Sequence, residues 1–175
     1  MSPKQYGSRL TVRRWTPEGV LQAEHSTLAP GAVDVLCIND EGANLVGSPT
    51  AGCDWVNLDV QAFTRGEAPR VKKMVASTIA LGCVHWDEGT RAAGKQVWVR
   101  IFGLHMYALV NSGLGVAMPG IIVPSSTAGQ AAPVLEASAT AGNWAQRLGH
   151  MLESHGGGGA EVRQVFIENP LRFPY

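Results

Sequence analysis

The segment from Gln96 to Pro133, QVWVRIFGLHMYALVNSGLGVAMPGIIVPSSTAGQAAP, decides the fold class of this chain. It opens with alternating aromatic and β-branched residues over Gln96 to Phe102, and a period of two residues is the pattern of a β-strand. No Asp, Glu, Lys or Arg occurs between Arg100 and Glu136, so the stretch is expected to lie in a packed β core.

The residues after this strand continue the β pattern. Leu104 to Val110 either extends the strand after a bulge at Gly103 or pairs back against it. A turn at Asn111-Ser112-Gly113 comes next, followed by a short apolar stretch and a loop rich in Ser, Thr and Gly. The whole segment contains no nucleophile–base pair, metal-ligand spacing or phosphate loop, which favours a structural or assembly role over catalysis.

The composition is that of a turn-rich β protein. Charged residues make up 16% of the 175 residues, below the usual ~25%, whereas Gly (21) and Pro (10) are frequent. A chain of this length is most often a single domain. We therefore expect a mainly β fold, a small β-barrel or sandwich with an extended N-terminal arm and at most one or two short helices.

Charge and hydropathy exclude two classes of partner. The formal net charge is zero, so neither nucleic acid nor a membrane surface is an expected partner. The most apolar window, Leu104 to Val123, is broken by three glycines and Pro119, which a membrane-spanning helix would tolerate poorly.

Three cysteines, Cys37, Cys53 and Cys83, form no CxxC pair, and their odd number indicates buried thiols in a reducing compartment. The N-terminal residues lack the apolar run of a secretory signal.

We expect three parts: an extended N-terminal arm (residues 1–28), a β-rich core domain (29–168) and a C-terminal tail (169–175). The arm mixes prolines and basic residues with apolar side chains, so it is expected to pair with a partner subunit by strand addition, the alternative being a frayed terminus. The tail, NPLRFPY, carries two prolines and cannot continue a central strand. The candidate partner-interface residues are Tyr6, Leu10, Arg13, Arg14, Trp15, Phe173 and Tyr175.

Two regions of the core are ambiguous between helix and strand. Val71 to Trp86 fits one helix or two strands joined by a loop, and Gly82 favours the strands. Arg147 to Ser154 and Glu161 to Glu168 indicate two strands around the glycine tip Gly156 to Gly159, although the first also has helical spacing. The remaining expected elements are strands at Val33 to Ile38 and Trp55 to Val60 and a small-residue loop at Ala137 to Trp144.

One run of residues, CVHWDE from Cys83 to Glu88, contains several potential ligands or catalytic groups. A metal site would need a second pair of ligands at a defined spacing, and none occurs. A nucleophilic Cys83 with His85 as its base would need an orienting group and an oxyanion hole, for which the sequence offers no candidate. We therefore expect no enzymatic activity, no cofactor and no metal. A cysteine- or metal-dependent hydrolase using Cys83 and His85 is the enzymatic alternative.

Three segments carry a resemblance to a known family. They are KQVWVRIFG at Lys95 to Gly103, ALVNSGLGVAMPGIIVPSSTAGQA at Ala108 to Ala131, and the closing pair Arg147 to Glu153 and Glu161 to Ile167 around a glycine-rich turn. Together they make roughly residues 70 to 168 resemble the small β-barrel virion proteins of tailed bacteriophages, in particular the head decoration, or cement, proteins.

The resemblance implies a structural protein that binds the outside of a phage capsid. Such a protein is made in the host cytoplasm, binds between capsomers of the virion and clamps neighbouring subunits of the major capsid protein, often as a homotrimer. A different virion component, such as a head-fibre base, a tail subunit or a shell subunit, is the alternative that the resemblance leaves open.

Overall fold

The computed structural model describes residues 11–17, 20–22, 31–59, 68–76, 80–112 and 115–168. The described residues are mainly β, as expected from the sequence, with one α-helix, α1 (Ala141–Ala145), and one 3-10 helix (Glu136–Ser138). The strands are β1 (Val12–Trp15), β2 (Ala32–Asn39), β3 (Leu45–Ser48), β4 (Gly52–Cys53), β5 (Trp55–Leu58), β6 (Arg70–Lys73), β7 (Ala80–Val84), β8 (Gly89–Arg91), β9 (Gln96–Ser112), β10 (Gly120–Pro124), β11 (Ala131–Leu135), β12 (Gly149–Met151) and β13 (Gly159–Ile167). Among these residues no helix is long and apolar enough to cross a membrane.

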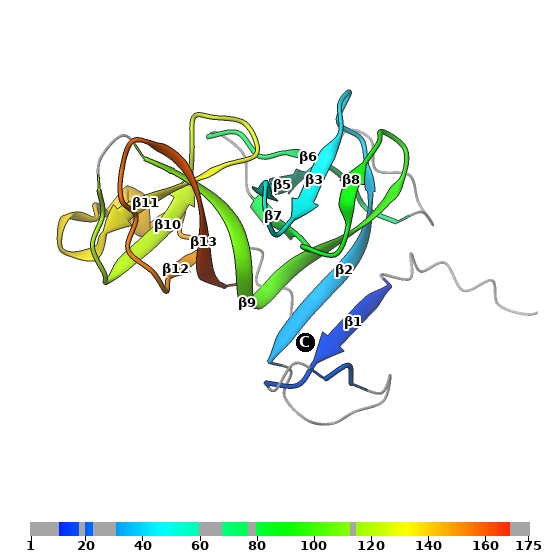
Figure 1. Cartoon of the computed structure of the whole chain (residues 1–175), viewed down its shortest axis with the longest axis horizontal. Helices are drawn as coiled ribbons and strands as arrows, with labels where there is room; N and C mark the ends of the chain where they lie inside the picture. The colour runs from blue at the N-terminus through cyan, green and yellow to red at the C-terminus, as the bar shows by residue number, and fades with distance from the viewer. Residues whose placement is uncertain are drawn as a thin grey trace, which may run out of the picture.

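The long strand β9 organises the fold because two sets of strands share it. The pairings β2–β6–β5–β7–β9–β2 close one ring, and the pairings β9–β11–β10–β12–β13–β9 close a second. Figure 1 shows the result as two lobes on either side of a bent β9. Two of these pairings are very short, because β2–β6 rests on two residue pairs and β9–β11 on one. The fold is therefore one mixed sheet and not a regular barrel.

The sequence allowed Leu104 to Val110 either to extend the preceding strand or to pair back against it. Extension is confirmed, because β9 runs unbroken to Ser112. The irregularity, however, lies two residues earlier than expected. Val33 pairs with Phe102 and Asp34 with Arg100, which leaves Ile101 as the extra residue. Gly103 instead marks where the lobes meet: its φ is +98°, and a Cβ there would lie 2.3 Å from a carbonyl oxygen of the segment before β2.

Each lobe has a buried core. The first-lobe core contains Val33, Val35, Cys37, Leu45, Val56, Val71, Leu81, Val84, Val97, Val99 and Ile101. The second core continues through the other lobe and includes Cys53, Trp55, Cys83, Ala108, Val110, Ile122, Leu148, Met151, Val165 and Ile167. Val97, Val99 and Ile101, which alternate along the predicted strand, all belong to the first-lobe core.

Most of the local predictions are confirmed, and two are wrong. Asn111 and Ser112, expected in a turn, are the last two residues of β9 and pair with Ala160 and Gly159. Val71 to Trp86 contains most of strand β6 and all of strand β7. Arg147 to Ser154 contains strand β12 and no helix. The loop expected at Ala137 to Trp144 instead contains the 3-10 helix and most of α1. A capping box starts α1: Thr140 Oγ1 accepts a hydrogen bond from the Asn143 backbone amide at 3.2 Å, and Asn143 Oδ1 accepts one from the Thr140 amide at 2.9 Å.

The loop between β10 and β11 fastens the second lobe to the first. The Trp55 amide donates to the Gly129 carbonyl at 2.9 Å, and the Gly129 amide donates to the Met74 carbonyl at 2.9 Å. Gly129 has φ +76°, and a Cβ there would lie 2.6 Å from the buried Asp54 Oδ1. Asp54 is itself held by Lys73 Nζ at 3.2 Å, so this carboxylate cannot move away without losing its partner.

The first prediction concerns this junction. Gly129→Ala should lower the free energy of unfolding by about 1–3 kcal/mol, because it combines a left-handed backbone with a clash against Asp54. Gly42→Ala is the matched control, since a Cβ at Gly42 meets nothing within 4 Å. Urea unfolding of both variants provides the measurement, and an equal stability of the two would contradict the junction described here.

Candidate functional site

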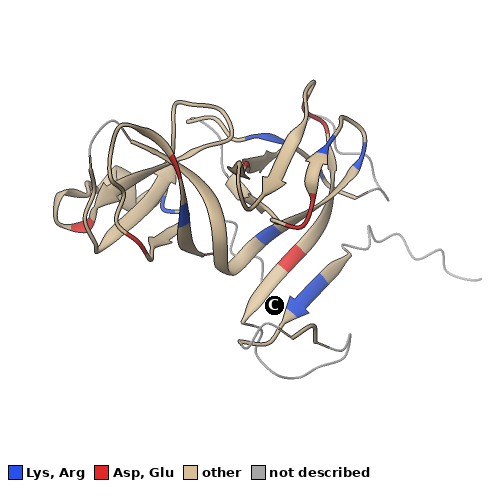
Figure 2. Cartoon of the chain, viewed as in Figure 1, with Lys and Arg blue, Asp and Glu red and all other residues tan. Residues whose placement is uncertain are grey.

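A buried carboxylate on β2 holds the N-terminal strand on the sheet. Asp34 is fully buried and accepts hydrogen bonds from Arg13 Nε at 2.8 Å, Trp15 Nε1 at 2.7 Å and Arg100 Nε at 2.8 Å. Strand β1 pairs antiparallel with β2, and its alternation places Arg13 and Trp15 on one face. Figure 2 shows the acidic position of β2 lying beside the basic positions of β1.

The charge of Asp34 is stabilised in spite of its burial. Burial alone would raise the pKa of this carboxyl group, but the hydrogen bond and positive charge of Arg100 outweigh it, with smaller contributions from His85 and Arg13. The net effect is a pKa below the usual value, so Asp34 is ionised at neutral pH. The ionised Asp34 is therefore the counter-charge of Arg100, which is also buried.

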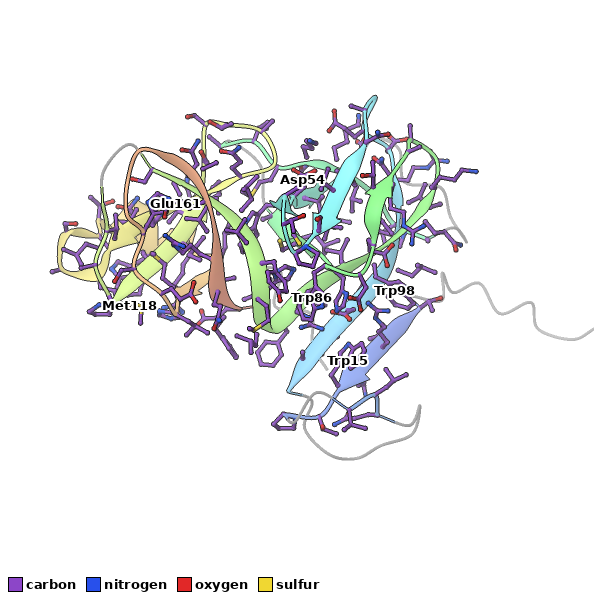
Figure 3. All side chains as sticks on the ribbon, viewed as in Figure 1. Trp15, Asp54, Trp86, Trp98, Met118 and Glu161 are labelled. Carbon is purple, nitrogen blue, oxygen red and sulfur yellow. The ribbon has the colours of Figure 1, made fainter. Side chains whose placement is uncertain are left out.

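Aromatic rings and guanidinium groups alternate above this carboxylate. The Arg13 guanidinium lies 4.4 Å from the centre of the Trp98 ring and 5.3 Å from that of Trp15, and the Arg100 guanidinium lies 4.7 Å from that of Trp86. Figure 3 shows the three labelled tryptophans gathered around β1 and β2. The stack fixes the position of Trp15, which belongs to β1, relative to residues of β9 and of the turn after β7.

A cavity of about 340 Å³ lies beside Trp15. Its wall combines apolar and aromatic side chains with four polar ones, a mixture typical of surfaces that bind small molecules or peptide segments. The lining residues are Trp15, Thr16, Pro17, Gly31, Ala32, His85, Trp86, Asp87, Arg100, Leu104 and Met106.

Two buried histidines in this region are neutral at physiological pH. His85 Nδ1 accepts a hydrogen bond from the Asp87 amide, which leaves its proton on Nε2, 3.9 Å from Asp34 Oδ2. His105 Nε2 lies 2.9 Å from the Val84 carbonyl oxygen. Burial is the main cause that lowers the pKa of His85 to about 4 and that of His105 to about 3.

Cys83 and His85, the pair considered for catalysis, do not form a nucleophile and its base. Cys83 is fully buried in the second core, and its Sγ donates to the Cys53 carbonyl oxygen at 3.3 Å. Burial raises the pKa of the Cys83 thiol well above its usual value, which disfavours the thiolate that a nucleophile requires. Over the described residues no group of three or more His, Cys, Asp or Glu side chains is arranged to hold a metal ion.

Of the seven candidate interface residues, three are described. Arg13 and Trp15 contact Asp34 of their own chain, whereas Arg14 is exposed on the other face of β1. The arm expected over residues 1–28 is therefore, at Val12–Trp15, a strand of the chain's own sheet. The candidates that lie outside the described residues are Tyr6, Leu10, Phe173 and Tyr175.

The sequence reasoning missed Asp34 and Arg100. The sequence did point to Asp34, because this acidic residue interrupts the apolar run Val33 to Ile38. An acidic side chain in a strand that is buried on both faces requires a paired cation or hydrogen-bond donors. Nothing in the local pattern identified the donors, since Arg100 lies 66 residues further along the chain.

A second surface feature lies on the second lobe, where four large apolar side chains are exposed. We call them the distal apolar group: Met118, Leu135, Trp144 and Leu152, with exposed fractions of 45%, 37%, 41% and 41%. Met118 precedes β10, Leu135 is the last residue of β11, Trp144 belongs to α1 and Leu152 follows β12; Gly120 pairs with Leu135. Figure 3 shows the labelled Met118 at the end of the second lobe that is remote from Trp15.

No protein-family model matches the chain, and no curated protein matches it significantly.

The second prediction tests the role of Asp34. Asp34→Asn leaves Arg100 buried without a counter-charge and should lower the free energy of unfolding by about 3–5 kcal/mol. Asp40→Asn is the control, because Asp40 pairs with Arg70 and Lys72 near the surface, where such pairs contribute about 0–1 kcal/mol. Urea unfolding at pH 7 measures both, and similar losses in the two variants would contradict the assigned role.

The third prediction concerns pH. The pKa values of His85 and His105 in the folded protein are below the ordinary 6.5, so the unfolded chain takes up protons first as the pH falls. Stability should therefore fall from about pH 6.5 down to the pKa of each folded-state histidine, about 4 for His85 and about 3 for His105, with a loss of about 2–3 kcal/mol per histidine by pH 4.5. The lowered pKa of Asp34 adds a further loss below about pH 4.

His105→Gln isolates one of these contributions. Glutamine does not titrate, and its amide can still donate to the Val84 carbonyl oxygen that His105 Nε2 contacts. The variant should lose less stability than the wild type between pH 6.5 and pH 4.5, measured by urea unfolding at several pH values. The same pH slope in both proteins would show that His105 does not remain neutral in the fold.

Proposed function

We propose that this protein is a structural virion component that binds the outside of a tailed-phage capsid and stabilises contacts between major capsid subunits, as a decoration (cement) protein does. The segments that carry the resemblance to such proteins contain most of β9, all of β10 and β12, and most of β13. They contribute most of the shared strand and several strands of the second lobe, and two members of the distal apolar group, Met118 and Leu152, lie in them.

The distal apolar group is the observation that carries the proposal. Interface cores are enriched in Met and Trp and depleted in charged residues, and each of the four side chains of this group is more than one third exposed. The net charge of zero gives the protein no long-range field toward a partner, and Figure 2 shows charges of both signs spread over both lobes. Short-range apolar contact is therefore the interaction that best suits this surface.

The proposed partners are the major capsid protein and further copies of this chain, in a homotrimer. Each copy would bury an interface of standard size, and the stability added to a shell would come from the large number of copies bound. The proposed location is the capsid surface of the virion, after synthesis in the host cytoplasm.

The fourth prediction tests this function. The purified wild-type protein should sediment with empty expanded capsids of its source phage and saturate them at a fixed ratio. Replacing Met118 and Leu152 together by Glu should weaken this binding at least about tenfold, because two charges would enter an apolar contact. Val75→Glu is the control, since Val75 is an exposed apolar residue of the first lobe, and it should bind normally.

Circular dichroism establishes that each variant is folded before binding is measured. Capsids that leave the wild-type protein in the supernatant would overturn the decoration role. Normal binding by the double variant would show that a different surface contacts the shell. A few copies per particle at saturation would identify a fibre-base or tail component instead.

A further inference from the structure

His150 of β12 lies between two carboxylates that come from different parts of the second lobe. Its Nδ1 lies 3.2 Å from Glu136 Oε1 of the 3-10 helix, and its Nε2 lies 3.0 Å from Glu168 Oε1, just after β13. The exposed fractions of the three side chains are 32%, 31% and 34%, so all three are partly shielded from water. The neighbours of His150 in the sheet, Ile121 of β10 and Phe166 of β13, are uncharged.

Only the protonated ring of His150 satisfies both of these contacts. An ionised carboxylate only accepts hydrogen bonds, so each ring nitrogen has to be a donor. The imidazolium ion carries a hydrogen on both nitrogens, whereas the neutral ring carries one and presents a lone pair to the other carboxylate. Histidine is the side chain that gains and loses its proton between about pH 5 and pH 8. Loss of the proton therefore turns one of the two contacts of His150 from attractive to repulsive.

Glu136 is the partner that the neutral ring of His150 would lose. Glu168 has a second partner that keeps it in place, because Arg147 Nη2 lies 2.6 Å from its Oε2. Glu136 makes the longer contact with the ring, and its backbone amide donates to the Pro119 carbonyl oxygen at 3.3 Å, near the limit of a hydrogen bond. The proton of the neutral ring would thus remain between His150 and Glu168.

The segment that contains Glu136 has no apolar anchor of its own. Over residues 135–147, which include the 3-10 helix and α1, no residue is buried. A segment with few buried apolar contacts opens locally at a low free energy, so its position depends on its polar contacts. It carries two members of the distal apolar group, Leu135 and Trp144. Leu135 is next to Glu136, and the Arg147 guanidinium lies 5.2 Å from the centre of the Trp144 ring.

We propose that His150 is a proton-dependent clamp on residues 135–147. The protonated ring holds Glu136 beside β12 and so fixes Leu135 and Trp144, whereas the neutral ring releases Glu136 and the segment loosens. The clamp follows from the contacts of His150 and is independent of the proposed function. Only its consequence, a capsid contact that is tighter at pH 6 than at pH 8, rests on that function.

Hydrogen exchange of the free, full-length chain tests the clamp. The amides of Glu136 and Ala139 report on the segment, because they donate to the carbonyl oxygens of Pro119 and Glu136. Their protection factors, followed by NMR and corrected for the intrinsic pH dependence of exchange, should be at least about threefold higher at pH 6 than at pH 8. Equal protection factors at the two pH values would overturn the proposal. The buried His85 and His105 cannot produce the expected result, because they destabilise the fold as the pH falls.

Glu136→Gln separates the clamp from other effects of pH. The glutamine amide group can donate to the ring nitrogen that carries no hydrogen in neutral His150, and its oxygen can accept from the protonated ring, so the contact no longer depends on the proton. This variant should show the same protection factor for the Ala139 amide at pH 6 and pH 8. A decrease as large as that of the wild type would overturn the proposal, because the pH dependence would then arise elsewhere.

His150→Gln removes the titrating group itself. It should show, at both pH values, the lower protection that the wild type has at pH 8, and a retained pH dependence would contradict the clamp. Circular dichroism establishes that both variants are folded, as expected for positions that are about one third exposed. No capsid enters these measurements, so a failure of the clamp is distinguished from a failure of the proposed function.

Discussion

The buried carboxylate of Asp34 is the interaction on which the N-terminal part of the structure depends. It binds donors from two segments of the chain, Arg13 and Trp15 of β1 and Arg100 of β9, and so joins the outermost strand to the central one. Buried ion pairs add little net stability when compared with apolar packing, but the loss of one partner is costly. The Asp34 cluster therefore determines where β1 lies more than it determines how stable the whole fold is, and the cavity exists because Trp15 is held beside it.

Strand β9 connects this cluster to the rest of the molecule. Its first half pairs with β2 and β7, and its second half pairs with β13, β11 and β4. The loop that contains Gly129 adds hydrogen bonds between the lobes through Trp55 and Met74. Two lobes held in this way present two surfaces far from each other, the cavity on the first lobe and the distal apolar group on the second (Figure 3).

The sequence predicted the elements that depend on local alternation and missed those that depend on distant partners. The period of two over Gln96 to Phe102 predicted the strand that forms the first part of β9. Helix α1 was missed because its residues are small and its start depends on a capping box of Thr140 and Asn143, which is a weak signal in a loop-like composition. Arg13 and Trp15 were predicted to lie on a partner surface, and their hydrogen bonds to Asp34 of the same chain could be recognised only once the strand pairing was known. The distal apolar group was missed because its members lie in connecting segments and at strand ends that follow no periodic pattern.

The central claim joins two statements: β1 is held by the chain itself, and the distal apolar group is the surface that we propose for contact with the capsid. Hydrogen–deuterium exchange of the full chain, free and bound to empty capsids, tests this claim most directly. We expect the amides of Val12–Trp15 that bond within the sheet to be protected in both states, and the segments around Met118, Leu135, Trp144 and Leu152 to gain protection on binding. Protection gained at Val12–Trp15 alone, with none on the second lobe, would contradict this arrangement.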